Sequence, residues 1–242
     1  MTDIAFRFHG ATLVPDLSGA LVWVEARTLI VADLHFEKAS SFAAKGLPLP
    51  PYDTTTTLAR LRVVIDRENP ARIICLGDSF HDHTAADRVH ADDIAQLRAM
   101  TARVEWIWVA GNHDPTPPDI FGGTVVHDFC TGPLTFRHVA EADASPGEVS
   151  GHYHPKAAVA TRGKPITRPC FVGDDRRIIL PAFGAFTGGL NVRDPAIARL
   201  LTPHFQVVML GQNKLHRFSG DQLKSQAVLT ADFYGLNRRR KI

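Results

Sequence analysis

The chain has 242 residues, of which 45% are hydrophobic and 21% are charged, and its formal net charge is +2. Such values are typical of a soluble globular protein with a substantial core, arranged as one large domain or two small ones. Because the charge is nearly neutral, composition alone gives no support for nucleic-acid binding.

The cysteines and the N-terminal residues indicate the compartment. Cys75, Cys130 and Cys170 are an odd number, lie far apart and form no CxxC pair, which argues against a disulfide framework and a cysteine zinc site. The first residues lack the basic and apolar regions of a signal peptide, and no apolar run approaches the length of a membrane span. We therefore expect a cytoplasmic protein with no membrane contact.

The first half of the chain alternates predicted strands and helices. Strands are expected over residues 20–24, 28–32, 72–76 and 104–110, where short apolar runs end at turn signals. Helices are expected over residues 53–68, with Asp53 or Thr54 as the N-cap, and over residues 85–101. Prolines 48, 50 and 51 prevent residues 45–52 from being helical throughout. This order predicts a mainly parallel sheet with covering helices.

The second half changes character after the proline-rich residues 115–118. Short strands joined by Gly and Pro turns are expected over residues 124–126, 134–139, 157–161, 170–172, 177–180 and 206–210. They predict a second, mixed sheet packed on the first, and therefore an α/β fold. No linker separates the halves, so residues 1–236 are expected to form a single domain. Residues 237–242 form a basic tail, expected to be poorly ordered.

Residues of the kinds that bind metals follow the predicted strands. They are Asp33, His35, Asp78, Asn112, His138, His152 and His154. In open α/β sheets, ligands collect at the carboxyl edge of the strands. Side chains two residues apart in an extended segment point the same way, so Asp33 and His35 can reach one metal, as can His152 and His154. Each of these motifs, taken alone, is typical of an ordinary turn. His127 is an alternative to His138 as the lone histidine ligand.

Geometry sorts these residues into two sites that share one carboxylate. The first site would contain Asp33, His35, Asp78 and His154, and the second would contain Asp78, Asn112, His138 and His152. Mixed nitrogen and oxygen ligands suit Mn, Fe, Zn, Co or Ni better than Mg or Ca. Two metals about 3.5–4 Å apart can activate a bridging water and clamp a phosphoryl group for in-line displacement.

The order of these motifs closely resembles the calcineurin-like metallophosphoesterase superfamily, whose pattern is D-x-H, G-D, G-N-H-D/E, a lone His and G-H-x-H. The chain has Asp33-Leu34-His35, Gly77-Asp78, Gly111-Asn112-His113-Asp114, His138 and Gly151-His152-Tyr153-His154. The resemblance implies a four-layer sandwich of two mixed sheets flanked by helices. It makes His113 the catalytic residue that contacts the phosphate and protonates the leaving oxygen. The phosphatase branch often has an Asp at the position of His81, so either Asp82 or Asp114 could orient His113 here.

A narrower resemblance covers nearly the whole chain. Asp33-Leu34-His35-Phe36-Glu37-Lys38, Leu49-Pro50-Pro51-Tyr52-Asp53-Thr54, Gly77-Asp78-Ser79-Phe80-His81-Asp82 and the glycine-rich residues 180–191 resemble the bacterial ligase-associated DNA-damage-response endonucleases. This resemblance implies phosphodiester cleavage in DNA during repair, two divalent metals with manganese preferred, and a DNA-repair ligase or helicase as partner.

Several alternatives remain open from the sequence. Lys38 and His81 are candidate substrate contacts, although a solvated ion pair and a polar loop explain them equally simply. Turns that let the backbone pass close to the metal loops account for the glycines of residues 183–191. The protein could instead hydrolyse a small nucleotide or cyclic nucleotide, or be an inactive metal-stabilised scaffold. The sequence leaves the oligomeric state undetermined.

Overall fold

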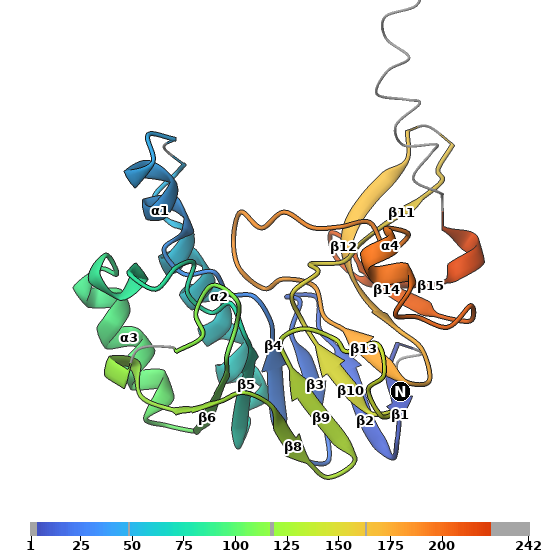
Figure 1. Ribbon diagram of the computed structural model, residues 1–242, viewed down its shortest axis with the longest axis horizontal. Coiled ribbons are helices and arrows are strands. Elements are labelled where there is room, and N and C mark those ends of the chain that lie inside the picture. Colours follow the sequence, from blue (N-terminus) through green and yellow to red (C-terminus); the bar gives the residue numbers. More distant parts are fainter. Residues whose placement is uncertain (1–3, 48, 117–118, 163, 224–242) are drawn as a thin grey trace, which may run out of the picture.

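Two β-sheets lie face to face in the computed structural model, with helices on the outer sides (Figure 1). The structure describes residues 4–47, 49–116, 119–162 and 164–223. The first sheet has the spatial order β1 (Phe6–Phe8), β2 (Ala11–Pro15), β3 (Leu21–Trp23), β4 (Thr28–Val31), β5 (Arg72–Leu76), β6 (Glu105–Val109) and β7 (Thr124–Val126). Strands β4 to β7 are parallel, whereas β1 to β4 are antiparallel.

The second sheet is also mixed. Its order is β15 (Leu215–Ser219), β14 (Gln206–Leu210), β12 (Ile166–Gly173), β13 (Arg177–Ile179), β10 (Glu148–Ser150), β9 (Leu134–Arg137) and β8 (Phe129–Thr131), and β11 (Lys156–Val159) pairs with β12. Strand β10 is parallel to both of its neighbours, β9 and β13. The expected second mixed sheet is therefore confirmed.

The helices are α1 (Lys38–Ala44), α2 (Asp53–Glu68), α3 (Ala91–Thr101) and α4 (Pro195–Ala198), with 3-10 turns at Ala85–Asp87, Asp119–Phe121 and Gly220–Gln222. Among the described residues, no helix is long and apolar enough to cross a bilayer.

Successive side chains of each strand face opposite sides of its sheet, and this alternation divides the core into three layers. In β5, Ile73 and Cys75 face α2 and α3, whereas Ile74 and Leu76 pack between the sheets against residues such as Phe171. A third cluster lies on the outer side of the second sheet and includes residues of α4. This alternation follows from the two-residue period of a strand that is buried on both faces, and it gives the four-layer sandwich that the resemblance implies.

The expected helix over residues 85–101 is wrong in its first turns. A short 3-10 turn ends at Asp87, and α3 begins only at Ala91, after His90 has adopted an extended conformation as its N-cap. Arg88 is held by Asp82 at 2.8 Å and by Thr84, contacts that favour a folded loop over a continuous helix. The basic tail, residues 237–242, lies outside the described residues, and the single domain remains a prediction.

Candidate metal centre

The expected metal ligands come from two sets of parallel strands, one in each sheet. Asp33 follows β4, Asp78 follows β5, and Asn112 follows β6 in the first sheet. In the second sheet, His138 follows β9, and His152 and His154 follow β10. Since the strands within each set run in the same direction, their carboxyl ends meet at one edge, where the two sheets face each other.

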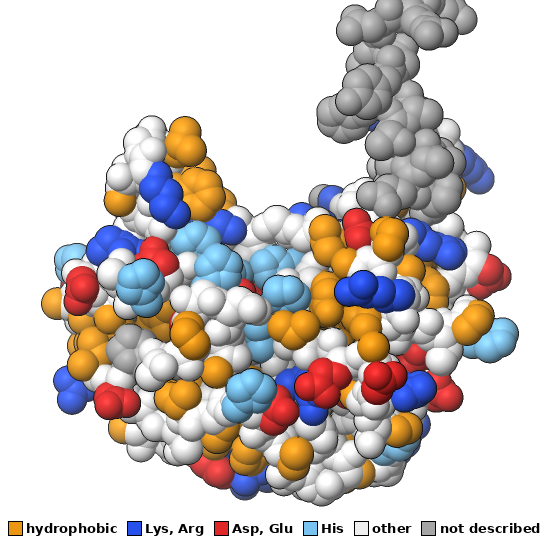
Figure 2. Space-filling model, in the orientation of Figure 1, with side chains coloured by type: hydrophobic (Ala, Val, Ile, Leu, Met, Phe, Trp, Pro, Cys, Tyr) orange, Lys and Arg blue, Asp and Glu red, His pale blue; other side chains and the backbone are white. Residues whose placement is uncertain are grey.

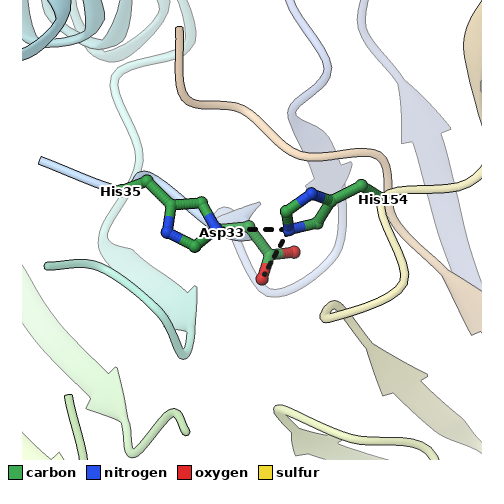
Figure 3. Close-up of side chains that lie close together, drawn as sticks. All are labelled: Asp33, His35 and His154. Carbon is green, nitrogen blue, oxygen red and sulfur yellow. Dashed lines mark hydrogen bonds and ion pairs between the residues drawn. The ribbon is translucent and has the colours of Figure 1, made fainter. Parts of the chain in front are cut away.

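The first group of donors contains Asp33, His35 and His154 (Figure 3). The two Nε2 atoms of His35 and His154 are 3.3 Å apart, and the Oδ1 atom of Asp33 is 3.4 Å from His154 Nε2. The backbone N–H of His152 donates to the Asp33 carboxylate at 2.9 Å and so fixes its orientation. The three donor atoms therefore converge on one point.

The second group contains Asp78, His138 and His152. His138 Nε2 lies 3.3 Å from Asp78 Oδ1 and 3.1 Å from His152 Nδ1. The other ring nitrogen of His138 is 2.9 Å from the carbonyl oxygen of Leu76, which accepts its N–H. A backbone acceptor of this kind holds a histidine with its second nitrogen directed at a metal.

Asn112 borders the second group. It lines a cavity of about 330 Å³ together with Gly111 and His138. His127 lines the same cavity, but its side chain is 91% exposed and pairs with Asp128 at 3.4 Å. The structure thus brings His138, and not the competing His127, into the donor cluster.

The donors suit two divalent cations. In each group two imidazole nitrogens and a carboxylate oxygen lie within 4.8 Å of one another, close enough for one cation to contact all three. The set of nitrogen and oxygen atoms matches Mn, Fe, Zn, Co or Ni. Asp78 belongs to the second group, and its role as a bridge to the first group remains a prediction.

The site lies at the surface. Figure 2 shows histidines gathered in a hollow, beside the projecting segment that carries α1 in Figure 1. Asp33 and His35 are buried, whereas His152 and His154 are partly exposed. A long substrate can therefore approach the donors from solvent.

The ligand loops have an unusual backbone. Five of the expected ligands, Asp33, His35, Asp78, His152 and His154, have positive φ angles between 44° and 71°. Non-glycine residues rarely adopt this conformation, and strain of this kind collects at functional sites. At Gly111 a Cβ atom would overlap the backbone nitrogen and the carboxylate of Asp78, so the β6 loop can approach the β5 loop only because this residue is glycine.

Charge shifts the pKa values of the second group in the metal-free chain. Burial opposes protonation of His138, but its hydrogen bond to Asp78 and the charges of Asp33 and Asp78 outweigh burial and raise its pKa to about 9. Burial likewise works to raise the pKa of Asp78, yet the hydrogen bond and charge of His138 hold it well below its usual range. A proton on His138 thus occupies the place that a cation would take.

Burial dominates at two neighbouring groups. It lowers the pKa of His35 to about 2, with the charge of His154 acting in the same direction, so His35 is neutral and able to bind a metal. Burial also raises the pKa of the Asp114 carboxyl to about 7, although N–H groups of Phe80 and Ser79 partly oppose it. Asp114 is a functional candidate that the sequence argument treated only as a partner for His113.

His113 lies beside the donors without joining them. Its side chain is 47% exposed, and its Nε2 atom is 3.9 Å from Asp78 Oδ2. Its backbone N–H donates to Asp78 Oδ1 at 2.9 Å, and its Nδ1 is 2.8 Å from the carbonyl oxygen of His81. With Nδ1–H donating to that carbonyl, Nε2 is left free to face a substrate.

The backbone carbonyl of His81, and not a carboxylate, orients the His113 ring. Asp114 accepts hydrogen bonds from the N–H groups of Ser79 and Phe80. Asp82 instead binds Arg88 and Thr84. Neither carboxylate has a hydrogen bond to the His113 ring within the described part of the chain. The sequence did not predict the His81 carbonyl as the partner of His113, because a backbone acceptor leaves no sequence motif.

The two candidate substrate contacts both lie near His35. The His81 ring stacks on His113 with centroids 5.1 Å apart, and its Nδ1 is 3.4 Å from His35 Nδ1. Burial, followed by the charges of Lys38 and His113, lowers the pKa of His81 to about 4. Lys38 begins α1, and burial lowers the pKa of its ammonium group. Direct contact of either residue with substrate remains a prediction.

One family model matches the chain, and solved structures resemble it. A model of the calcineurin-like phosphoesterases matches residues 26–167. The crystal structure of Pseudomonas putida nuclease MPE has a TM-score of 0.68 and 26% sequence identity to this chain, covering 88% of this chain and 98% of that one. Yfce, a phosphoesterase from E. coli, has a TM-score of 0.37 and 13% identity, covering 82% and 96% of the two chains. No curated protein matches the chain.

Proposed function

Because the chain belongs to the calcineurin-like phosphoesterase family, it is a metal-dependent phosphoesterase, and we propose that it is a nuclease that cleaves phosphodiester bonds in DNA. The observation that carries the proposal is the pair of convergent donor groups at an open surface. The likeness of the chain to Pseudomonas putida nuclease MPE, which covers 88% of this chain, supports a polymer substrate over a small nucleotide. A metal-stabilised scaffold would need the donor groups but not the imidazole of His113 beside them.

The proposed mechanism uses two divalent ions, manganese by preference. Asp33, His35, Asp78 and His154 would hold the first ion, and Asp78, Asn112, His138 and His152 would hold the second. Such ions supply Lewis-acid activation of the phosphoryl group and of the attacking water. The chain itself positions the acid. The His81 carbonyl accepts from Nδ1–H of His113, and the Asp78 carboxylate accepts from its backbone N–H, so that in the imidazolium form Nε2–H can deliver its proton to the leaving sugar oxygen.

The biological setting is proposed from the subfamily resemblance. We place the activity in DNA repair, in the cytoplasm, with a repair ligase or helicase as partner. Lys38 and His81 are proposed to contact the substrate, and one domain over residues 1–236 is proposed to contain the whole site.

The test is an assay of purified protein with single-stranded DNA, duplex DNA and bis-p-nitrophenyl phosphate, each with Mn²⁺ or with EDTA. We expect Mn²⁺-dependent cleavage of DNA and of the small diester. Hydrolysis of the small diester without any DNA cleavage would favour a small-molecule phosphoesterase. Inactivity with every metal tested would favour the scaffold.

A further inference from the structure

A segment between β13 and α4 is attached to the first donor group. Figure 1 shows it, in orange, reaching from β13 toward α2 and returning to α4. At its start, Phe183 N–H donates to the carbonyl of Ala32 at 2.8 Å, and Gly184 N–H donates to the carbonyl of Asp33 at 3.0 Å. The next residue, Ala185, donates to Thr57 Oγ1 of α2. One end of the segment is therefore fixed to the backbone of a metal-ligand loop.

The other end is fixed to the second sheet. Leu190 N–H donates to the carbonyl of Tyr153, and its own carbonyl accepts from Lys156 N–H at 2.8 Å. A Cβ atom at Gly184 would overlap the carbonyl of Leu34, and one at Gly189 would overlap the carbonyl of His154. The segment thus crosses from the Asp33–His35 loop to the His152–His154 loop with backbone-to-backbone contact at both ends.

Phe186 lies in the middle of this crossing and differs from its neighbour Phe183. Phe183 is fully buried, and the Arg60 guanidinium lies over its ring at 4.3 Å. Phe186 is 50% exposed and has φ of 55°. A single exposed apolar side chain is ordinary, but a bulky residue in the left-handed region is a backbone outlier. Glycine would adopt this conformation without strain, and strained residues of this kind cluster at functional sites, which points to a use for the ring.

The position of Phe186 limits what that use can be. It is two residues from Gly184 and three from Gly189, so its Cα lies within about 7 Å and about 11 Å of those two positions. Both positions touch loops that carry Asp33, His35 and His154. The ring therefore lies on an exposed stretch of chain whose two ends are fixed beside the donor loops. It has no charge or hydrogen-bonding group, so it can offer a substrate only an apolar, aromatic face.

We propose that Phe186 is a stacking platform for an unpaired base of the nucleotide next to the scissile phosphate, an inference that rests on the proposed nuclease function. Bases stack on aromatic side chains of single-strand-binding proteins with little regard to sequence, because every base has a π-face. A base inside a duplex is already stacked on both sides. Phe186 therefore selects unpaired substrate strands, while the metal ligands and His113 carry out the reaction.

The experiment compares Phe186→Ala and Phe186→Trp with wild-type protein in cleavage of single-stranded DNA and duplex DNA and in Mn²⁺ content. We expect Phe186→Ala to raise KM for single-stranded DNA about 5-fold to about 150-fold, the range found for lost base–aromatic stacking. Phe186→Trp should retain single-strand cleavage, and both variants should bind as much Mn²⁺ as wild-type protein. Leu190→Ala is the matched control, since Leu190 is an exposed apolar residue, 38% accessible, on the same segment.

Substrates with one abasic site separate stacking from a structural role. For wild-type protein, one abasic position beside the cleaved bond should raise KM to the level of Phe186→Ala, which itself should be insensitive to that position. Equal single-strand KM values for wild type and Phe186→Ala would overturn the stacking proposal while leaving the nuclease function intact. Loss of bound Mn²⁺ in Phe186→Ala would also overturn it, because the ring would then support the metal centre. Absence of DNA cleavage by wild-type protein would instead overturn the nuclease function.

Discussion

At the scale of single residues, His113 has the clearest separate task. It has a free Nε2 atom near Asp78, and its ring is oriented by a backbone carbonyl. Because it is outside both donor groups, His113→Ala should leave both metals bound. The rate of DNA cleavage should fall by about 10²–10⁴, as expected when a general acid is lost. Metal analysis and single-turnover cleavage measure the two effects.

The leaving group provides the control for this prediction. A nitrophenolate leaves without a proton, whereas the alkoxide of a DNA sugar needs one. His113→Ala should therefore affect DNA cleavage much more than hydrolysis of bis-p-nitrophenyl phosphate. Equal losses on both substrates would mean that His113 stabilises transition-state charge instead of donating a proton, and a lost metal would make it a ligand.

His138 makes the stability of the metal-free protein depend on pH. Its pKa is raised from 6.5 to about 9, so the folded state binds its proton more tightly than the unfolded state. The resulting stabilisation is fully present below pH 6.5 and is lost as pH rises through 9. We expect EDTA-treated protein to lose up to about 3 kcal/mol of unfolding free energy between pH 7 and 9. Urea unfolding at several pH values measures this loss.

The same titration should govern metal binding. A histidine must be deprotonated to bind a cation, so Mn²⁺ affinity should rise from pH 7 to 9, and binding should release a proton. His35 and His81 have lowered pKa values and are neutral throughout this range. A His138→Gln variant, which has no proton to lose, is the control. An equally steep loss of stability in that variant would assign the effect to another group.

At the scale of elements, the close contact between the β5 and β6 loops depends on Gly111. A Cβ atom there would overlap Asp78 and the Asp114 carboxylate. Gly111→Ala should therefore displace Asp78, weaken metal binding and cost about 1–3 kcal/mol of stability, the usual range for overpacking. Metal content, cleavage rate and urea unfolding measure these effects. Gly188→Ala is the control, since no neighbouring atom lies within 4 Å of its Cβ position, and comparable losses in both variants would contradict this account.

The elements differed in how well the sequence predicted them. The helix over residues 53–68 was predicted correctly as α2, because its long apolar face has a clear period. The expected N-cap was wrong, since Tyr52, and neither Asp53 nor Thr54, takes that position. Strand β10, Glu148–Ser150, was missed because two of its three residues are polar although all three are buried. The break before α3 was missed because it depends on tertiary contacts of Arg88. The donor groups were easier to predict, since each ligand follows a strand whose carboxyl end meets the others at one edge.

At the scale of the whole molecule, each donor group joins the two sheets. Asp33 and Asp78 lie in the loops after β4 and β5 of the first sheet. His138 and His154 lie in the loops after β9 and β10 of the second sheet. A side-chain contact within the first group, between His35 and His154, spans 119 residues of sequence. Neither group can exist before the sheets have packed together, because neither sheet contributes a complete set.

This division has a kinetic consequence. Contacts between residues so far apart in sequence form late in folding, because loop closure must precede them. Mn²⁺ should therefore lower the unfolding rate constant and leave the refolding rate constant nearly unchanged, as expected for interactions absent from the transition state. Stopped-flow refolding and unfolding in urea, with Mn²⁺ or EDTA, measure both constants. Faster refolding with Mn²⁺ would mean that the ligand loops meet early. If Mn²⁺ slows only unfolding, the bound cations set the lifetime of the native state.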